Sequence, residues 1–445
     1  MSGVDAINEV IAREAPALWS ALSPLGRACF YPPDIPFQAA QARGKRFNAT
    51  IGQITDGAGR ILPLPSIAEA LGGFADEDLN RALLYSPIDG LPELRERWHA
   101  WHRPAGDAVP PSSLPVVTCG LTHGLAIAAD LFGGPGRMVV VPSPFWGNYR
   151  QVFGLRTGAT ILPAPAYDEE RRWVPTAIAD AMTELPAGEP VVALLNVPSN
   201  PGGYSPTESE RRILVQSLIR AAEQRPLVVV CDDAYSGLVF EPDIPKSSLF
   251  WELIGAHPNL VPIRLAGSTK EFVFFGGRVG FVTFPWASGT PLMDALENKV
   301  RGLIRAGVGS PTALSQITLL QAMRRDDAAD QVRDVVEVMA ERYRVLRAAL
   351  EQFTDPALFR VLPFNSGVFA VLELAPGRHA NEARLELLES QDVGLVSIGD
   401  RFLRIAFCSI DKDSIPELVE RTVAGLREIA ARDRSRSASV STTGT

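Results

Sequence analysis

The sequence predicts an α/β protein with a mostly parallel sheet covered by helices on both faces and a smaller α/β unit beside it. Two observations support this prediction. From Pro115 to Thr290, short β-branched runs alternate with stretches of helical periodicity, a pattern typical of parallel strands joined by crossover helices. The chain has 445 residues, 46% of them hydrophobic and 21% charged, which is an ordinary globular composition with room for two or three domains.

The chain begins with an amphipathic arm, in which apolar residues recur at helical spacing as far as a Tyr-Pro-Pro stretch at Tyr31. The expected strands of the main sheet are the short apolar runs Val116–Thr118, Met138–Val141, Val191–Leu195, Leu227–Cys231, Val261–Leu265 and Val279–Thr283. The run Val261–Leu265 is the weakest of these, because Pro262 is tolerated only near the start of a strand or on an edge. Helical patterns lie between several runs, at Thr122–Phe132 and Glu208–Glu223.

One long helix is expected from Asp327 to Gln352, and the remaining elements suggest the smaller unit, at Gly367–Leu374, Leu385–Gln391, Phe402–Phe407 and Ile415–Ala431. We divide the chain into an N-terminal arm with part of the small domain (1–60), a large domain (61–320), a C-terminal small domain (321–431) and a tail (432–445). The tail is polar and lacks large apolar residues, so we expect it to be disordered.

Charge and composition exclude several classes of function. The 43 basic and 51 acidic residues give a net charge of −8, which argues against duplex nucleic acid as the main partner. The four cysteines lie far apart and suggest neither a zinc site nor a disulfide framework. The first residues have no apolar core of signal-peptide length, and no apolar run is long enough to span a bilayer. We therefore expect a cytoplasmic protein without a metal, membrane or nucleic-acid partner.

Polar residues follow several predicted strands, at the sheet edge where ligands bind in this class of fold. Asn200 lies in an Asn-Pro-Gly-Gly segment that would by itself indicate only a turn. Asp232, Asp233 and Tyr235 follow the run Leu227–Cys231, and two acids at the end of a buried strand are costly unless they are paired or functional. A Mg²⁺ site is the competing interpretation, although no phosphate-binding Gly-x-x-x-x-Gly-Lys loop accompanies these acids.

Lys270 follows the run Val261–Leu265 and stands beside a strongly apolar stretch. A lysine in apolar surroundings has a lowered pKa and can act as a Schiff-base nucleophile, whereas an isolated lysine is more often a surface residue. Arg278 suits a phosphate clamp. Gly120, Leu121 and Thr122 open a helix after Val116–Thr118, where free backbone N–H groups form an anion site.

Together these residues meet the requirements of pyridoxal phosphate. This cofactor needs a lysine for its aldehyde, an acid for its pyridinium nitrogen, a phosphate cup with an arginine, and usually an aromatic side chain against its ring. Trp146 is the candidate for the aromatic side chain, although packing in the core would also explain it.

At this point the sequence resembles the class I/II aminotransferases of the fold-type I pyridoxal-phosphate superfamily, in their aspartate-aminotransferase-like branch, from about Asn48 to Phe407. The matching motifs occur in family order: Asn-Ala-Thr-Ile-Gly-Gln at 48–53, Tyr-Ser-Pro-Ile-Asp-Gly at 85–90, Trp-Gly-Asn at 146–148, Asn-Pro-Gly-Gly at 200–203, Asp-Asp-Ala-Tyr at 232–235, the spacing of Lys270 and Arg278, and Leu-Arg-Ile-Ala-Phe at 403–407. The resemblance implies a homodimer, with a seven-stranded, mostly parallel sheet between helices in the large domain and a small domain built from both chain ends.

The resemblance also implies roles for individual residues. Lys270 would hold the cofactor as a Schiff base, the internal aldimine, while Asp232 and Tyr235 would contact the ring nitrogen and O3′. The remaining implied cofactor contacts are Tyr85 from the neighbouring subunit, Gly120, Leu121, Thr122, Trp146, Asn200, Ser268 and Arg278. Ser268 would substitute for a family serine at the position of Gly267, and Gly202 replaces a family threonine.

The implied function is a pyridoxal-phosphate-dependent aminotransferase, which moves an amino group between an amino acid and a 2-oxo acid. Arg404 and Asn200 would orient the substrate's α-carboxylate, and Gly52 lies in the loop implied to contact substrate. The alternative is a lyase, a γ-eliminating enzyme or a carbon–carbon-bond-forming enzyme on the same fold, acting on an amino-acid-derived substrate such as S-adenosylmethionine.

Arg305 resembles the arginine that, in the aspartate branch, reaches from the neighbouring subunit to the side-chain carboxylate of aspartate or glutamate. It precedes a Gly-Ser-Pro turn at 309–311, where the family has Ser-Asn-Pro. Three alternatives remain open: Arg305 ends a helix that runs from about Leu292, it contacts the cofactor phosphate across the dimer, or Arg301 is the true ligand.

Overall fold

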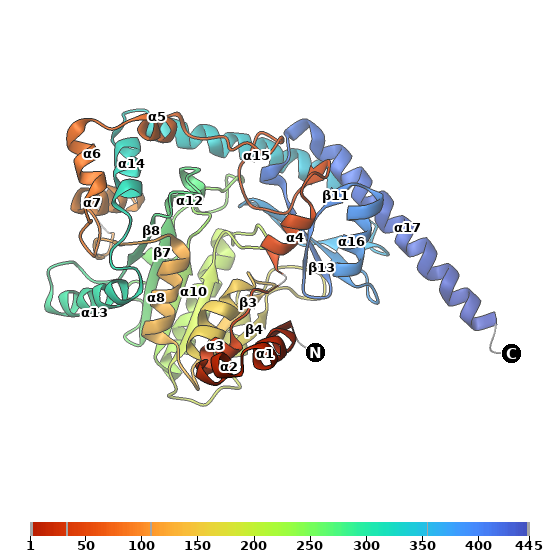
Figure 1. Cartoon of the computed structure of the whole chain (residues 1–445), viewed down its shortest axis with the longest axis horizontal. Helices are drawn as coiled ribbons and strands as arrows, with labels where there is room; N and C mark the ends of the chain where they lie inside the picture. Colours follow the sequence, from red (N-terminus) through yellow and green to blue (C-terminus); the bar gives the residue numbers. More distant parts are fainter. Residues whose placement is uncertain (1–2, 33, 107–108, 354, 443–445) are drawn as a thin grey trace.

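The chain folds into a large sheet packed between helices and a smaller unit that carries the C-terminal part of the chain (Figure 1). This computed structural model describes residues 3–32, 34–106, 109–353 and 355–442. The large sheet has seven strands in the order β2-β8-β7-β6-β5-β3-β4. Their bounds are Val116–Thr118 (β2), Met138–Ser143 (β3), Thr160–Pro165 (β4), Val191–Asn196 (β5), Leu227–Asp232 (β6), Leu260–Gly267 (β7) and Gly280–Thr283 (β8).

All neighbouring strands of this sheet are parallel except β8, which runs antiparallel to both β2 and β7. The predicted mostly parallel seven-stranded sheet is therefore confirmed, as are the strands expected from the short apolar runs. Strand β7 is central rather than an edge, so Pro262 is tolerated there because it lies near the start of the strand.

Strand β4 is missing from the predicted set because it contains Pro163 and Pro165, which argue against a strand. In the structure β4 forms the edge of the sheet and pairs only with β3. A proline can occupy such an edge because its missing N–H would have faced away from the partner strand.

Helices cover both faces of the sheet because successive strand residues point to opposite sides. Val139 and Val141 of β3 pack in one cluster with α8 (Leu121–Phe132) and α13 (Pro291–Gly307). Val140, between them, packs in a second cluster with α9 (Ala177–Ala181), α10 (Glu208–Gln224) and α11 (Phe250–Leu253). The sheet is thus buried on both sides, which leaves the carboxyl ends of its strands as the place for a site.

The remaining helices of the large unit flank this layered core. They are α5 (Pro65–Gly72), α6 (Asp76–Leu83), α7 (Pro92–His102), the single-turn α12 (Ser268–Glu271), the π-helical segment Arg150–Leu155, and α14 (Ala313–Arg324). Helix α15 (Ala328–Gln352) then runs along the top of the molecule in Figure 1 from α14 to the smaller unit. It matches the predicted long helix within one residue at its start.

The smaller unit contains an antiparallel sheet of four strands in the order β12-β13-β10-β9. Its elements are β9 (Phe359–Val361), β10 (Phe369–Leu374), α16 (Ala380–Ser390), β12 (Val396–Ile398), β13 (Phe402–Ala406), the short 3₁₀ turns Phe407–Ser409 and Lys412–Ser414, and α17 (Ile415–Thr442). Strand β1 (Phe47–Asn48) pairs in parallel with β11 (Val393–Gly394), and α4 (Ile35–Gln41) contacts β11 and β12. Both ends of the chain therefore build this unit.

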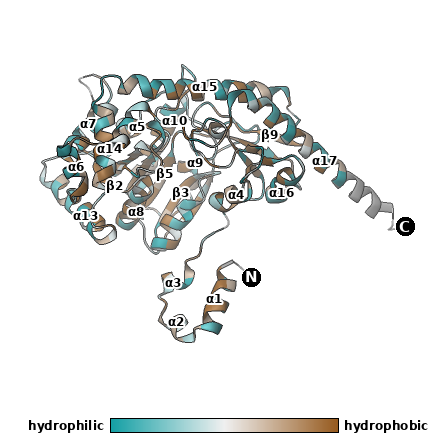
Figure 2. Cartoon of the chain, turned by 45° about the horizontal axis from the view of Figure 1, so that its top comes forward, coloured by the Kyte–Doolittle hydropathy of each residue, from teal (hydrophilic) through white to brown (hydrophobic). Residues whose placement is uncertain are grey.

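The two ends of the chain differ in how far they follow the sequence-based expectations. The N-terminal arm is helical as predicted, with α1 (Gly3–Glu14), α2 (Pro16–Ala21) and α3 (Pro24–Ala28) standing apart from the body (Figure 2). At the other end, α17 continues through 432–442, where we expected disorder, because extending a formed helix needs no new nucleation. Residues 443–445 of that expected tail lie outside the described residues. Within the described chain, no helix combines the length and apolarity needed to cross a membrane.

Candidate active site

A cavity of about 440 Å³ lies beside the carboxyl ends of β5, β6 and β7, between the large sheet and the smaller unit. The N-terminal segment closes one side of it through Ile35 and Gln53. The structure brings most of the predicted site residues to this one cavity: Gly52, Leu121, Thr122, Trp146, Asn200, Asp232, Tyr235, Lys270, Arg278 and Arg404.

Lys270 is presented by α12, directly after the central strand β7. Its Nζ lies 5.0 Å from the centre of the Tyr235 ring. Burial lowers the pKa of Lys270 to about 8, because a charged amine is disfavoured away from water, and the positive charge of Arg278 adds to this effect. About a tenth of this amine is therefore neutral and nucleophilic at pH 7, a far larger share than for a lysine with the ordinary pKa of about 10.4.

Asp232 ends β6 and is only 2% exposed. The Tyr149 hydroxyl donates to its Oδ2 at 2.6 Å, and the Ala234 N–H donates to its Oδ1 at 3.1 Å. Burial raises the pKa of Asp232 to about 6, although both hydrogen bonds and the nearby Lys270 oppose the rise. The carboxylate is thus fixed in place and is ready to hold a cationic partner in the cavity.

Arg404 comes from β13 of the smaller unit and is 1% exposed. Its Nη1 donates to Asn200 Oδ1 at 3.0 Å, its Nη2 donates to the Thr50 carbonyl at 2.6 Å, and its guanidinium lies 4.1 Å from the centre of the Phe369 ring. Burial lowers its pKa to about 10, which still leaves it charged at neutral pH. None of its described partners is a carboxylate, so Arg404 offers the cavity an uncompensated planar cation that suits an incoming carboxylate.

Asn200 and Tyr235 extend this arrangement across the cavity. Asn200 Nδ2 donates to the Tyr235 hydroxyl at 3.3 Å, while its Oδ1 accepts from Arg404. Burial raises the pKa of Tyr235, so its hydroxyl keeps its proton. One amide therefore orients both a phenol and a guanidinium, which come from different units of the fold.

The opposite end of the cavity suits a phosphate. Leu121 and Thr122 line it at the N-terminus of α8, where backbone N–H groups have no partner within the helix, and Arg278 adds a guanidinium. Gly120 has φ +80° and lies against this guanidinium, since an added Cβ would be 2.4 Å from Arg278 Nη2. Glycine is needed here both for the backbone conformation and for the close approach.

The structure corrects one predicted contact in this region. Ser268 is fully buried and faces the Val279 carbonyl, which its N–H approaches at 3.2 Å and its hydroxyl at 3.4 Å. It does not line the cavity, whereas the next residue, Thr269, does. The turn into α12 directs Ser268 toward β8, so Thr269 has the better position for a phosphate contact.

Tyr85 and Arg305 also lie outside this cavity. Tyr85 is 97% exposed, and Arg305 lies on the exposed side of α13. Helix α13 spans Pro291–Gly307, so the expected helix from about Leu292 is present and Arg305 stands in its last turn. Within the described chain neither side chain reaches Lys270.

Asp233 turns away from the cavity and begins a buried polar chain. Its Oδ2 accepts from Arg264 Nε at 2.5 Å, and Arg264 Nη2 lies 3.1 Å from His102 Nδ1. His102 Nε2 in turn lies 3.2 Å from Glu271 Oε2, and Trp101 Nε1 donates to Glu271 Oε1 at 2.7 Å. This chain connects the residue after Asp232 with the residue after Lys270, and therefore supports the two strand ends from behind.

Tyr149, Thr269 and Phe369 are among the lining residues that sequence reasoning missed. Tyr149 carried a usable signal, because it stands three residues after Trp146, and such a spacing on a helical turn places both on one face. The two rings meet edge to face, with centroids 5.5 Å apart. Phe369 had no such signal, since its role depends on Arg404, which is far away in the sequence.

Comparison with known proteins agrees with this geometry. The family model for aminotransferase class I and II matches residues 46–421. The 2-aminoadipate transaminase of Thermus thermophilus is 28% identical over 84% of this chain and 89% of its own length. The mitochondrial aspartate aminotransferase of Schizosaccharomyces pombe is 24% identical over 74% of each chain.

Solved structures share the fold. An aminotransferase from Anaerococcus prevotii superposes with a TM-score of 0.79 at 18% identity, covering 92% of this chain and 99% of that one. The aspartate aminotransferase of Thermus thermophilus with maleate has a TM-score of 0.72 at 19% identity, covering 91% and 99%. The fold is therefore that of the fold-type I aminotransferases. Because the family model covers most of its length, this chain belongs to the class I and II aminotransferases, the pyridoxal-phosphate-dependent enzymes that move an amino group between an amino acid and a 2-oxo acid.

Proposed function

We propose that the cavity around Lys270 is the active site of this aminotransferase. The observation that carries the proposal is the meeting of three buried groups on one cavity: an amine of lowered pKa, a carboxylate fixed by Tyr149, and the guanidinium of Arg404 without a carboxylate partner. Transamination needs each of these groups: the amine binds the cofactor's aldehyde, the carboxylate holds the cationic ring nitrogen, and the guanidinium orients the amino acid.

The residues present fit pyridoxal 5′-phosphate. Leu121, Thr122, Thr269 and Arg278 would hold the phosphate, and Asp232 would hold the ring nitrogen in its protonated form. Trp146 would lie against the ring, with Tyr235 and Asn200 beside its oxygen. When bound, the cofactor supplies an aldehyde that reacts with amines and a ring that accepts electrons.

The chain's own residues would then handle the substrate and its proton. Arg404 and Asn200 bind the α-carboxylate and so fix which face of the amino acid meets Lys270. The amine of Lys270, once free, takes the proton from the substrate's Cα as a general base and later returns it as an acid. A pKa of about 8 suits both directions near neutral pH.

The loop at Gly52 helps to shape the substrate side of the cavity. A Cβ at this position would lie 2.6 Å from Phe369 Cζ, so glycine lets the loop pack directly onto the ring that supports Arg404. The lyase alternative has no comparable support, because the relatives named above are aminotransferases.

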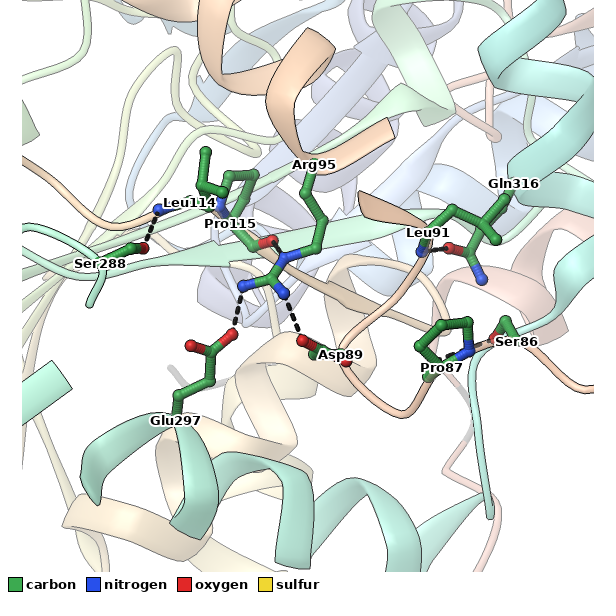
Figure 3. A network of polar contacts seen from close by, with 10 residues as sticks. All are labelled: Ser86, Pro87, Asp89, Leu91, Arg95, Leu114, Pro115, Ser288, Glu297 and Gln316. Atoms are coloured by element: carbon green, nitrogen blue, oxygen red, sulfur yellow. Dashed lines mark hydrogen bonds and ion pairs between the residues drawn. The ribbon is translucent and has the colours of Figure 1, made fainter. Parts of the chain in front are cut away.

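We also propose a homodimer in which Tyr85 serves the partner's phosphate site. Two hydrogen bonds hold its loop. The Ser86 hydroxyl donates to the Pro311 carbonyl at 2.6 Å, and the Leu91 N–H donates to Gln316 Oε1 at 2.8 Å, the second of which is drawn in Figure 3. These buried bonds fix the loop while Tyr85 itself points to the surface. Exposed apolar side chains on the two segments joined by the Ser86 bond are Leu83, Leu84, Val308 and Leu314, and a partner subunit would cover them.

The proposed substrate pair includes a dicarboxylate, glutamate or 2-oxoglutarate. The names of the two relatives above, a 2-aminoadipate transaminase and an aspartate aminotransferase, both refer to amino acids with a side-chain carboxylate. Arg305 of a partner subunit is one candidate ligand for that carboxylate. It stands on the exposed side of α13, and the ion pair of Arg95 with Glu297 joins this helix to α7, which follows the Tyr85 loop.

The test is a half-reaction experiment with Lys270→Ala. The wild-type holoenzyme, mixed with amino acids one at a time, should convert to its amine form with a clear change in the visible spectrum. Lys270→Ala should lack the visible absorption band of the Schiff base between lysine and cofactor. Its turnover should fall at least about 10⁴-fold, because the lysine that links the cofactor and carries the proton is removed. A yellow, active Lys270→Ala enzyme would contradict the site assignment.

A further inference from the structure

A second cavity, of about 460 Å³, adjoins the one around Lys270. The two cavities share Ile35, Trp146 and Asn200 as walls. The second extends away from Lys270, between α4, the loop after β3 and helix α16 of the smaller unit. A side chain of a substrate bound at Arg404 could therefore point into it, past Trp146 and Asn200.

Hydrogen bonds fix one wall of this second cavity. Helix α4 is clamped to β12 by Gln38, which is 7% exposed: its Oε1 accepts from the Ser397 N–H at 2.8 Å and its Nε2 donates to the Ser397 carbonyl at 3.3 Å. Gln38 and Ser397 both line the cavity. Hydrogen bonds between the N-terminal segment and the sheet of the smaller unit thus fix this wall of the cavity.

A buried arginine faces this cavity without an acidic partner. Arg384 of α16 is 3% exposed and lines the cavity. Its Nε and Nη2 donate only to the Asn381 side-chain oxygen, at 3.2 and 2.9 Å, and the described residues place no carboxylate within ion-pair distance of it. Burial without an opposing charge lowers its pKa, the sign of an uncompensated cation. Removing such a charge from water costs free energy, and a bound anion would offset that cost.

One acid lines the same cavity, and its protonation state affects which ligand charge the cavity favours. Asp34, at the N-terminus of α4, has a buried Oδ1 without a hydrogen-bond partner. Burial raises its pKa, since the carboxylate is partly removed from water. An ionised Asp34 would oppose an anion in this cavity and favour a cation, so the experiment below includes a cationic ligand.

We propose that Arg384 binds the distal carboxylate of a dicarboxylic substrate whose α-carboxylate is held by Arg404. This inference rests on the proposed active site and assigns its side-chain specificity to the chain's own smaller unit. It places substrate discrimination between α4 and α16, and it differs from recognition by Arg305 of a partner subunit.

The experiment compares two unreactive ligands of equal length, glutarate and pentanoate, by titration calorimetry on the holoenzyme. Both can place one carboxylate at Arg404, but only glutarate has a second. Glutarate should bind about 10- to 100-fold more tightly, the range for hydrogen bonds to a charged group. Arg384→Met should remove this difference, and Arg384→Lys should keep part of it. The control is Arg427→Met, which makes the same change at an exposed position of α17 and should leave the ratio as in the wild type.

Arg384→Met should fold, because it replaces an unpaired buried cation by an apolar side chain of similar length. Its melting temperature without ligand should equal or exceed that of the wild type, whereas the rise produced by glutarate should be lost.

Other outcomes would overturn the inference. If Arg305→Leu removes the preference for glutarate and Arg384→Met does not, the distal carboxylate belongs to the partner's arginine. If 5-aminopentanoate binds more tightly than glutarate and Asp34→Asn weakens it, the cavity takes a cation. If Arg384→Met abolishes binding of inorganic phosphate while the preference for glutarate stays, Arg384 serves a free anion. Failure of the proposed active site is distinguishable, because it would appear as absent half-reactions in the wild type.

Discussion

At the scale of single residues, Asp232 and Asp233 show how neighbours in the sequence serve different parts of the molecule. Asp232 lines the cavity and is held by the Tyr149 hydroxyl, while Asp233 pairs with Arg264 behind it. The local pattern offered two adjacent acids, and only the family resemblance singled out Asp232, since the partners of the two acids lie 83 and 31 positions away.

Substitution should separate the two roles. Asp232→Asn should fold normally and lower kcat by about 10²-fold or more, because an amide cannot stabilise a cationic ring nitrogen. Asp233→Asn should instead lower the free energy of unfolding by about 3 kcal/mol, since it leaves the buried Arg264 without its counter-charge. Steady-state kinetics and urea unfolding of both variants measure these effects. Loss of rate in Asp233→Asn with an unchanged Asp232→Asn enzyme would reverse the assignment.

The lowered pKa of Lys270 predicts a pH dependence for loading the cofactor. Only the neutral amine attacks an aldehyde, so the rate of reaction between the apo-chain and pyridoxal phosphate should rise with pH and level off above about pH 8. An ordinary lysine would keep rising to about pH 10.4. Stopped-flow absorbance between pH 6.5 and 10 gives the midpoint. In Asp232→Asn the midpoint should move lower, because the attraction that raises the lysine pKa is removed. A wild-type midpoint near pH 10 would be inconsistent with a buried amine.

At the scale of elements, the sequence predicted the helices and strands that have a recognisable pattern of apolar and capping residues within their own segment. Strands β3, β5 and β6 are short apolar runs, and α10 carries a clear Thr-to-Glu capping box at Thr207 and Glu210. Strand β4 was missed because its prolines are acceptable only at an edge, and edge position is a property of the assembled sheet. The motif residues at strand ends were predicted for the same local reason, while Tyr149, Phe369 and Arg384 act through partners or cavities that form only after folding.

Arg95 of α7 joins three elements and makes the Tyr85 loop part of a rigid unit. Its Nε donates to the Pro115 carbonyl at 2.8 Å, and its two terminal nitrogens pair with Asp89 and with Glu297 of α13 (Figure 3). All three side chains are largely buried. A network of this kind fixes the loop relative to the helix that carries Arg305.

Removing the cation of Arg95 should lower the free energy of unfolding more than neutralising the acid Glu297. Arg95→Met should lower the free energy of unfolding by about 3–5 kcal/mol, because Asp89 and Glu297 are then left buried without a counter-charge. Glu297→Gln should lower the free energy of unfolding by less, since Arg95 still has Asp89 as its counter-charge. The double variant Arg95→Met/Glu297→Gln should recover part of the loss, as expected for coupled neighbours. Urea unfolding measures all three variants, and a double variant whose loss equals the sum of the two single losses would mean that the network is not coupled.

At the scale of the whole molecule, the proposed site is assembled from distant parts of the chain. Asp232 and Lys270 come from the large sheet, Arg404 from the smaller unit, and Ile35 and Gly52 from the N-terminal segment. The described chain nevertheless leaves Tyr85 at its surface, along with apolar side chains of the separate arm, such as Ile7, Val10 and Leu18. Exposed apolar surface on this scale favours a second copy of the chain as its partner.

Mixing two impaired variants tests whether each site is built from two chains. If Tyr85 acts in the partner's site, Tyr85→Ala should bind the cofactor weakly and Lys270→Ala should be inactive, each as a homodimer. A hybrid dimer has one site with both substitutions and one site with neither, because Lys270 comes from one chain and Tyr85 from the other. Random exchange makes half of the dimers hybrid, so about a quarter of all sites should regain wild-type activity. The mixture is assayed after exchange in mild urea, and sedimentation velocity confirms the dimer. If Tyr85 served its own chain, no hybrid site would combine an intact Lys270 with an intact Tyr85, and activity would not return.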